Sequence, residues 1–391
     1  MLIAILGRQP QLSLAELESY FGSDLVTQFN EGVALINTSS ANIDHFGGVL
    51  KFAKVKDQFD LKSLQKNLKD LEKSCLVHLP SDQGKITLGI SWYGDRIPLK
   101  LLHNLAMKIR FGLKKRGASV RLLPISQLNI STATAHHNQL GKNPKKIEVI
   151  VVNNHKQVIV GYSIGSQNIS AYRDRDQKRP KRDSKVGMLP PKLAQIIVNL
   201  SRPETASAAR NGTLLDPFCG TGVILQEAHL LGFDIIGSDI EPRMIEYSRQ
   251  NLNWLSDKLT KTELLVGDAT NTKWPKFDCV ASEAYLGRPF GTPPTRTQII
   301  AEKQLVQPII SGFLKNLRQQ ISPTGQVCLA IPAWLETHER YADIDLVRPE
   351  RLSQLGYKIK HFSLVSHQDL LYYRPGQSVA RRLLVLQPKG D

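Results

Sequence analysis

The stretch Leu214-Leu215-Asp216-Pro217-Phe218-Cys219-Gly220-Thr221-Gly222 decides the fold of this 391-residue chain. An apolar strand ends in a carboxylate, a proline enters a tight glycine-containing turn, and a helix follows at once. This arrangement leaves backbone N–H groups and the positive end of a helix facing a ligand. In a doubly wound sheet, ligands bind at the carboxyl end of the first strand. The stretch therefore predicts an α/β domain with a ligand site at this turn.

The next predicted strand, residues 234–239, ends in a second acid, Asp239. A carboxylate in this place can bind the two hydroxyls of a ribose. A nicotinamide fingerprint has three glycines, the first directly after the strand, whereas Leu225 stands here in the place of the third. A phosphate-binding loop needs Gly-Lys-Ser/Thr, which the turn lacks. The two strands therefore favour the S-adenosylmethionine (SAM) site of a Rossmann-type methyltransferase.

The rest of the C-terminal half alternates between helix and strand patterns, which is typical of a parallel sheet. The predicted elements are helices at 191–200, 223–231 and 242–255, strands at 263–266, 277–282 and 326–331, and a terminal antiparallel hairpin of 357–365 with 378–386.

The N-terminal part has a different pattern, which predicts α+β units. Its expected strands are 1–6, 25–29, 33–37, 86–92, 119–123, 148–152 and 157–164, and its expected helices are one opened by a capping box at 13–16, a Lys/Leu-rich stretch at 56–74, and 98–116. Residues 165–190 are rich in Lys and Arg with poor periodicity, and we interpret them as a basic connector.

The positive charge is concentrated in one segment. The chain has 51 Lys and Arg against 35 Asp and Glu, a net charge of +16. Residues 101–200 contain 18 basic and 4 acidic residues, so this block alone carries +14. Such clustering favours a binding surface for a polyanion such as nucleic acid over a merely solvated basic face. The candidate RNA-binding residues in the connector are Arg173, Arg175, Arg179 and Arg182.

Cysteine and histidine usage narrows the class of protein further. The four cysteines are far apart and predict reduced, mostly buried thiols in a cytoplasmic protein. The ten histidines lack zinc-site spacing, so no metal is expected.

No apolar run approaches the roughly 18 residues that suggest a transmembrane helix. Residues 1–7 are too short for a signal peptide's apolar core and lack its basic leader.

Several motifs together resemble the THUMP-containing tRNA guanosine-10 N2-methyltransferases. They are the N-terminal segment 4–17, the THUMP-like Asn129-Ile130-Ser131-Thr132-Ala133, the segments 179–183 and 187–194, and the more widely shared 216–222. The resemblance implies a ferredoxin-like domain at 1–55, a THUMP RNA-binding domain at 56–165, a basic linker at 166–190 and a Rossmann-type methyltransferase domain at 191–391. It also implies tRNA as the partner, with no membrane association, and assigns no activator subunit.

The chain departs from that family at one motif. The family usually has Asp-Pro-Pro-Tyr after the fourth strand, whereas this chain has Ser282-Glu283-Ala284-Tyr285. In the usual motif the acid and a backbone carbonyl bind the target amine, and the aromatic ring stacks on the extruded base. Ser282, Glu283 and Tyr285 are therefore the candidate catalytic residues. Loss of both prolines makes the loop less rigid.

The remaining candidates form the cofactor site. We expect Asp216, Phe218, Gly220 and Gly222 around the methionine end of SAM, Asp239 at the ribose, and Asp268 near the adenine. The leading hypothesis is a SAM-dependent enzyme that methylates an exocyclic amine of tRNA, N2 of a guanosine. Two alternatives stay open: a catalytically silent tRNA-binding protein, and a DNA adenine-N6 methyltransferase.

Overall fold

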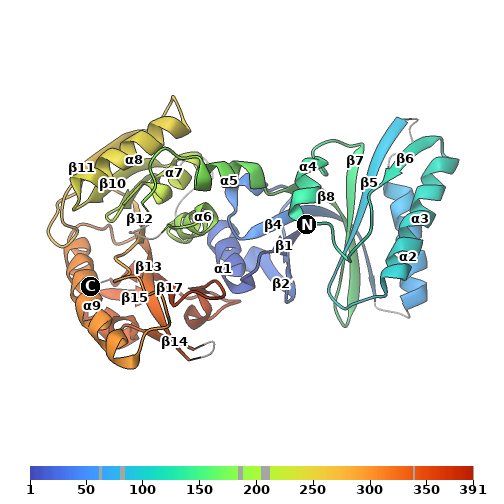
Figure 1. Cartoon of the computed structure of the whole chain (residues 1–391). Coiled ribbons are helices and arrows are strands. Elements are labelled where there is room, and N and C mark those ends of the chain that lie inside the picture. The colour runs from blue at the N-terminus through green and yellow to red at the C-terminus, as the bar shows by residue number, and fades with distance from the viewer. Residues whose placement is uncertain (61–63, 80–83, 184–187, 204–211, 338–339, 391) are drawn as a thin grey trace. The chain divides into compact units, whose positions relative to one another are not determined.

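A computed structural model describes residues 1–60, 64–79, 84–183, 188–203, 212–337 and 340–390. The chain divides into two compact units (Figure 1). The first contains residues 1–14 and 21–171, and the second contains residues 15–20 and 172–391.

The first unit is built on one eight-stranded sheet in the order β2-β3-β1-β4-β8-β7-β5-β6. Its strands are β1 (Leu2–Leu6), β2 (Val26–Asn30), β3 (Val33–Ile36), β4 (Val49–Asp60), β5 (Gly84–Tyr93), β6 (Ala118–Leu122), β7 (Lys146–Asn153) and β8 (Gln157–Ser166). Because β4 pairs with both β1 and β8, the sheet continues across position 55, where we expected a domain boundary. The division into ferredoxin-like and THUMP domains therefore stays a prediction.

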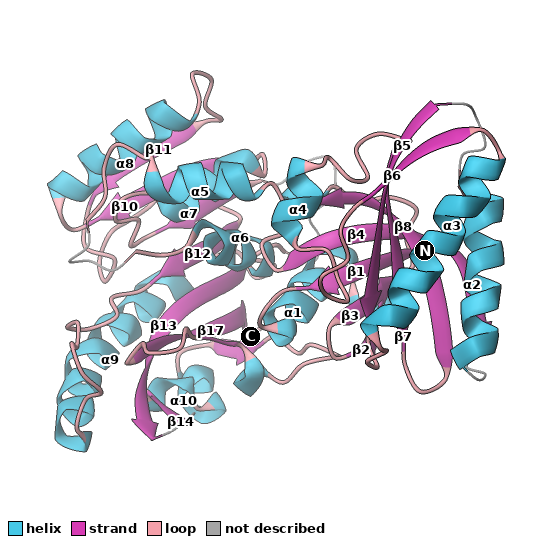
Figure 2. Ribbon diagram, turned by 45° about the vertical axis from the view of Figure 1, so that its right-hand side comes forward, coloured by secondary structure: helices cyan, strands magenta, loops and turns pink. Residues whose placement is uncertain are grey.

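The helices before the connector are α1 (Pro10–Phe21), α2 (Leu64–His78), α3 (Leu99–Lys115) and α4 (Thr132–His137), with 3₁₀ turns at Ser23–Leu25 and Ile43–His45. In the first unit α2 and α3 lie side by side along the sheet (Figure 2). The apolar face of α3 recurs at three- and four-residue intervals and is buried, as an amphipathic helix requires. Its buried side chains are Leu102, Leu105, Ala106, Ile109 and Leu113.

Two local predictions for the N-terminal half were wrong. Residues 56–60 form the end of β4, not the start of a helix, because their exposure alternates along an extended strand. The first helix begins at Pro10, three residues before the predicted cap. Ser13 lies inside that helix, and its Oγ donates a 2.7 Å hydrogen bond to the carbonyl of Gly48.

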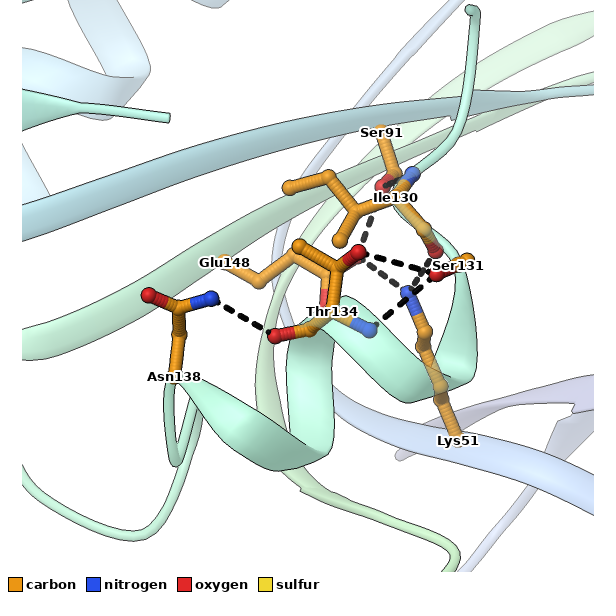
Figure 3. A network of polar contacts seen from close by, with 7 residues as sticks. All are labelled: Lys51, Ser91, Ile130, Ser131, Thr134, Asn138 and Glu148. Atoms are coloured by element: carbon orange, nitrogen blue, oxygen red, sulfur yellow. Dashed lines mark hydrogen bonds and ion pairs between the residues drawn. The ribbon is translucent and has the colours of Figure 1, made fainter. Parts of the chain in front are cut away.

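A buried polar network fixes the segment that precedes α4 (Figure 3). Lys51, on β4, is 1% exposed, and its Nζ lies 2.5 Å from Glu148 Oε1 and 2.6 Å from the Ile130 carbonyl. Ser91 Oγ donates to the same Glu148 oxygen and accepts from the Ile130 amide. A buried charge is tolerated only when it is paired in this way. The network therefore holds the THUMP-like segment, whose Ser131 caps α4 through the Thr134 amide.

The second unit contains a nine-stranded sheet whose main path is β11-β10-β9-β12-β13-β17-β15. Its strands are β9 (Thr213–Asp216), β10 (Asp234–Asp239), β11 (Thr262–Val266), β12 (Cys279–Glu283), β13 (Gln326–Thr337), β14 (Arg340–Asp343), β15 (Tyr357–Ile359), β16 (Leu371–Tyr372) and β17 (Val379–Pro388). Strands β9 to β13 are parallel, and β17 runs antiparallel between β13 and β15. This confirms the predicted Rossmann-type sheet with an antiparallel pair at its end, although the predicted strand 357–365 forms only at residues 357–359.

The helices of the C-terminal half are α5 (Ile169–Gln177), α6 (Pro191–Leu200), α7 (Val223–Leu230), α8 (Pro242–Leu255), α9 (Arg296–Arg318) and α10 (Pro349–Gln354), with 3₁₀ turns at Asp345–Val347 and His367–Asp369. Helix α5 was not predicted, because it lies in the segment interpreted as a connector. Helix α9 was not predicted either, since a proline such as its internal Pro308 usually ends a helix. The capping box of Thr295 and Gln298 was the available signal for α9.

One hydrophobic cluster of this unit lies between the sheet and α9. The helix buries Val306, Ile310, Phe313, Leu314 and Leu317 against strand residues of β9, β12 and β13. All four cysteines of the chain are buried and form no disulfide bond. No helix in the described part of the chain has the length and apolarity needed to cross a membrane.

Candidate functional site

The glycine turn between β9 and α7 has the geometry that the sequence predicted. Gly220 and Gly222 have φ of 52° and 80°, in the left-handed region that favours glycine. A Cβ at Gly222 would also lie 2.8 Å from Ser248 Oγ. That hydroxyl donates a 2.8 Å hydrogen bond to the Gly220 carbonyl, so α8 supports the turn from behind. The turn is therefore fixed in shape before any ligand binds.

Asp216 ends β9 at the floor of the site and is 1% exposed. Its Oδ1 accepts a 2.6 Å hydrogen bond from Ser282 Oγ and a 3.3 Å bond from the Phe218 amide. Burial raises the pKa of this carboxyl to about 7, although both hydrogen bonds act against the shift. The group is consequently poised to ionise when a cation comes beside it.

Asp239 and Asp268 follow the next two strands at the same edge. Asp239 accepts hydrogen bonds of 2.9 Å from the Gly220 amide and 3.0 Å from the Glu241 amide. Burial raises the pKa of Asp239, and these backbone bonds oppose that shift. Asp268 Oδ1 accepts from both the amide and the hydroxyl of Thr270 at 2.8 Å. Both carboxylates are therefore held in one orientation at the carboxyl edge of the sheet.

A cavity of about 540 Å³ joins these groups. Its lining includes Asp216, Phe218, Gly220, Asp239 and Asp268, five of the six predicted cofactor residues. Gly222 is not among the lining residues and stands at the N-terminus of α7. The lining also includes apolar side chains that the sequence did not single out: Leu189, Ile240, Met244 and Ile309. A cavity of this size, mostly apolar with a few oriented polar groups, suits a small-molecule cofactor.

The residues at the end of β12 and just after it differ in where their side chains lie. Glu283, Ala284 and Tyr285 line the cavity, and Tyr285 is 40% exposed. Ser282 is fully buried, and its hydroxyl contacts Asp216 instead of the cavity. Glu283 Oε1 accepts a 2.5 Å hydrogen bond from Arg381 Nε. Arg381 was not among the predicted residues, because no local sequence pattern relates it to a residue 98 positions earlier.

The four candidate RNA-binding arginines also differ in exposure. Arg173 and Arg182 are exposed. Arg175 pairs with the buried Glu227, with Nε and Nη2 at 2.6 and 3.1 Å from its two carboxylate oxygens. Arg179 is 3% exposed, and burial lowers its pKa. Of the four, Arg173 and Arg182 are therefore the two that offer a guanidinium to solvent.

Part of the basic segment packs against the turn. The Asn251 side chain, on α8, accepts from the Lys181 amide and donates to the carbonyls of Lys181 and Thr221. Residues 179–183 thus belong structurally to the second unit and lie next to the glycine turn. No group of three or more His, Cys, Asp or Glu side chains able to hold a metal ion occurs among the residues that the structure describes.

These residues fit SAM. The ionisable Asp216 suits a ligand with a cationic methionine end, Asp239 suits a diol, and the 64%-exposed Ile240 offers an apolar contact for a purine. The fold and the cavity together are typical of the Rossmann-type methyltransferase class. More narrowly, the chain belongs to the family described as DNA methylase, whose model matches residues 36–250, more than half of the chain. A second model, described as methyltransferase domain, matches residues 208–353.

Curated relatives agree with this class. A tRNA (guanine(10)-N2)-dimethyltransferase of Methanothermobacter thermautotrophicus is 32% identical over 43% of this chain and 43% of its own length. One of Pyrococcus abyssi is 39% identical over 27% of this chain and 30% of its own. The chain thus aligns with less than half the length of these relatives. The crystal structure of TrmN from Thermus thermophilus matches 99% of both chains with a TM-score of 0.52 at 17% identity, which shows a shared fold.

Proposed function

We propose that this protein transfers the methyl group of SAM to an exocyclic amine of a base in tRNA, N2 of a guanosine. The observation that carries the proposal is that Glu283 and Tyr285 line the same cavity as Asp216, Asp239 and the glycine turn. The groups that we assign to the cofactor and those that we assign to the base thus share one cavity, as methyl transfer requires.

The chemistry of an exocyclic amine explains the roles of these groups. The nitrogen lone pair is delocalised into the purine ring, so acceptors that bind its N–H groups help to hold it in line with the methyl group. We assign this role to Glu283 and a backbone carbonyl of the following loop, while the exposed ring of Tyr285 stacks on the extruded base. SAM supplies the methyl group as an electrophile. We assign Ser282 an indirect role, through its hydrogen bond to Asp216.

On the cofactor side we assign Asp216, Phe218, Gly220 and Gly222 to the methionine end of SAM. Asp239 accepts from the ribose hydroxyls, and Asp268 lies at the adenine end. These assignments follow the order of the strand ends β9, β10 and β11 along the edge of the sheet.

Three observations support tRNA as the substrate. The curated relatives are named as tRNA (guanine(10)-N2)-dimethyltransferases. Residues 101–200 carry a net charge of +14, which suits a phosphate backbone. The THUMP-like segment is held by the buried Lys51 network. We accordingly propose that residues 1–165 contain the ferredoxin-like and THUMP domains and that the protein acts on tRNA in the cytoplasm.

The description of the matching family as DNA methylase favours DNA as a competing substrate, and adenine N6 is the exocyclic amine that we consider there. The same acceptor and stacking groups serve that amine, so the site alone does not discriminate. The test is transfer of labelled methyl from SAM to unmodified tRNA from the source organism, with double-stranded DNA as the parallel substrate. Label in tRNA, located at N2-methylguanosine by nucleoside mass spectrometry, supports the proposal, whereas label in DNA adenine replaces it.

Variants of Glu283 test the catalytic assignment. Glu283→Gln keeps one neutral acceptor and should be slower than wild type, and Glu283→Ala should be slower still. Wild-type protein that binds both SAM and tRNA but transfers no methyl to either nucleic acid would instead indicate a silent tRNA-binding protein.

A further inference from the structure

Glu283 has a fixed partner that comes from a distant strand. Arg381 lies on β17, and β13 separates that strand from β12. The Arg381 side chain is 8% exposed and the Glu283 side chain 15% exposed. Their contact, 2.5 Å from Nε to Oε1, is therefore a largely buried ion pair at the rim of the cavity.

The strand register explains how the two side chains meet. Glu283 pairs with Ala330 on β13, and Arg381 pairs with Pro332 two residues further along the same strand. Side chains two residues apart, and residues directly opposite, share one face of a sheet. Glu283 and Arg381 therefore lie on the same face, separated by the row that contains Ala330. Because Ala330 carries only a methyl group, the long arginine side chain can cross β13 to reach the carboxylate.

The pairing leaves half of the carboxylate available. Arg381 donates through Nε to Oε1, and Glu283 Oε2 accepts no hydrogen bond from any residue in the described ranges. A glutamate has three rotatable side-chain bonds, and the adjoining loop has Ala284 and Tyr285 in the places after it, without proline. A charge-assisted bond to one oxygen removes most of that freedom and fixes the direction of the other.

We propose that Arg381 is a positioning residue for methyl transfer: it holds Glu283 so that Oε2 binds the target amine in line with the methyl group. This inference rests on the proposed function. In this chain a guanidinium on β17 thus provides the rigidity that a proline-rich loop would otherwise give. Because misplacement by about 1 Å can cost on the order of 100-fold in rate, the effect belongs to the transfer step and not to cofactor binding.

The neighbouring Arg382 provides a matched control. It is similarly covered, with a side chain 12% exposed, and it pairs with Asp343 at 3.0 and 3.1 Å. Being the next residue on β17, it points to the opposite face. Substitution of either arginine breaks one ion pair on the same strand, but only Arg381 contacts Glu283.

The experiment measures single-turnover methyl transfer to tRNA, with SAM and tRNA affinities determined separately. We expect Arg381→Met to slow transfer roughly 10- to 100-fold with both affinities within about twofold of wild type. Arg382→Met should leave the rate unchanged, and Arg381→Lys should restore part of it, since lysine keeps the charge without the planar fork. Thermal unfolding of each variant reports whether the fold persists.

A double-substitution cycle separates positioning from a general structural role. If Arg381 acts through Glu283, adding Arg381→Met to Glu283→Ala should cause no further loss. The inference is overturned if the rate losses of the two single variants multiply in the double variant. It is also overturned if Arg381→Met transfers methyl at the wild-type rate per bound tRNA. Both outcomes leave the proposed function intact. A wild-type protein without transfer activity rejects the proposed function and the inference together.

Discussion

Ser282 Oγ donates a 2.6 Å hydrogen bond to Asp216 Oδ1, and so joins the carboxyl end of β12 to the carboxyl end of β9. Both side chains are almost fully buried. The serine therefore replaces a solvent contact of the carboxylate and fixes its orientation at the floor of the cavity. Cofactor binding should respond to the charge on this one group.

The pKa of about 7 for Asp216 predicts pH-dependent SAM binding. A cationic ligand favours the carboxylate, so affinity should fall as pH drops through 7, by about tenfold between pH 8 and pH 6 if only the ionised form binds. Calorimetry at both pH values measures this difference. The Asp216→Asn variant should bind SAM weakly, and its affinity should lack the part of the pH dependence that Asp216 causes. Equal wild-type affinities at pH 6 and pH 8 would contradict the assignment.

The same shift bears on the stability of the ligand-free protein. The folded-state pKa of Asp216 lies above the ordinary value of 3.8, so the folded state binds more protons between these values. The contribution of Asp216 to stability is therefore fully present below about pH 4 and is lost as pH rises through 7. SAM should oppose this loss by stabilising the ionised form.

Tyr285 provides a test of base stacking. Stacking on an aromatic ring is worth about 1–3 kcal/mol per base, so Tyr285→Ala should lower turnover by roughly 5- to 150-fold, with little change in tRNA affinity. Tyr285→Phe keeps the ring and should stay close to wild type. Trp254→Ala removes a ring of similar exposure, 39% against 40%, outside the cavity lining, and is the control. Unchanged turnover in Tyr285→Ala would argue against stacking.

Sequence patterns predicted several elements of the second unit accurately, but not the contacts between them. The ends of β10, α6 and α8 agree with prediction, because a buried parallel strand and a proline-started helix have strong local signals. The local pattern could not show that Ser282 turns toward Asp216 while Glu283 lines the cavity. Nor could it find Arg381, since that contact depends on strand register across β13.

The basic connector illustrates the same limit. Its arginines appear equivalent in sequence, but Arg175 binds the buried Glu227 and Arg179 is itself buried. The net charge of a segment does not show which of its guanidinium groups are exposed to solvent. The test of RNA binding therefore uses the two exposed arginines, Arg173 and Arg182.

Replacing Arg173 and Arg182 together by glutamine should reduce the slope of log affinity for tRNA against log salt concentration by about 1.5. Lys114 and Lys115, exposed at the end of α3, should give a similar reduction if the first unit also contacts phosphate. The charge-matched control is Lys258→Gln with Lys261→Gln, two exposed lysines outside residues 101–200. Filter binding at several salt concentrations gives the slopes, and a slope unaffected by the arginine pair would make the connector a solvated surface only.

The Lys51–Glu148 pair predicts a stability effect confined to the first unit. Lys51→Met leaves a buried, uncompensated carboxylate, which typically costs about 3–5 kcal/mol. No other group compensates the charge of Glu148 at Oε2, since that atom has no hydrogen-bond partner among the described residues. Adding Glu148→Leu removes the isolated charge and should recover most of the loss. Because the chain has two units, hydrogen exchange of the β7 and β8 amides measures the change more directly than a single melting temperature. If Lys51→Met speeds exchange and Glu148→Leu does not reverse the effect, the ion pair is not its main cause. Lys51 would then act chiefly through its hydrogen bond to the Ile130 carbonyl, and so through the segment before α4.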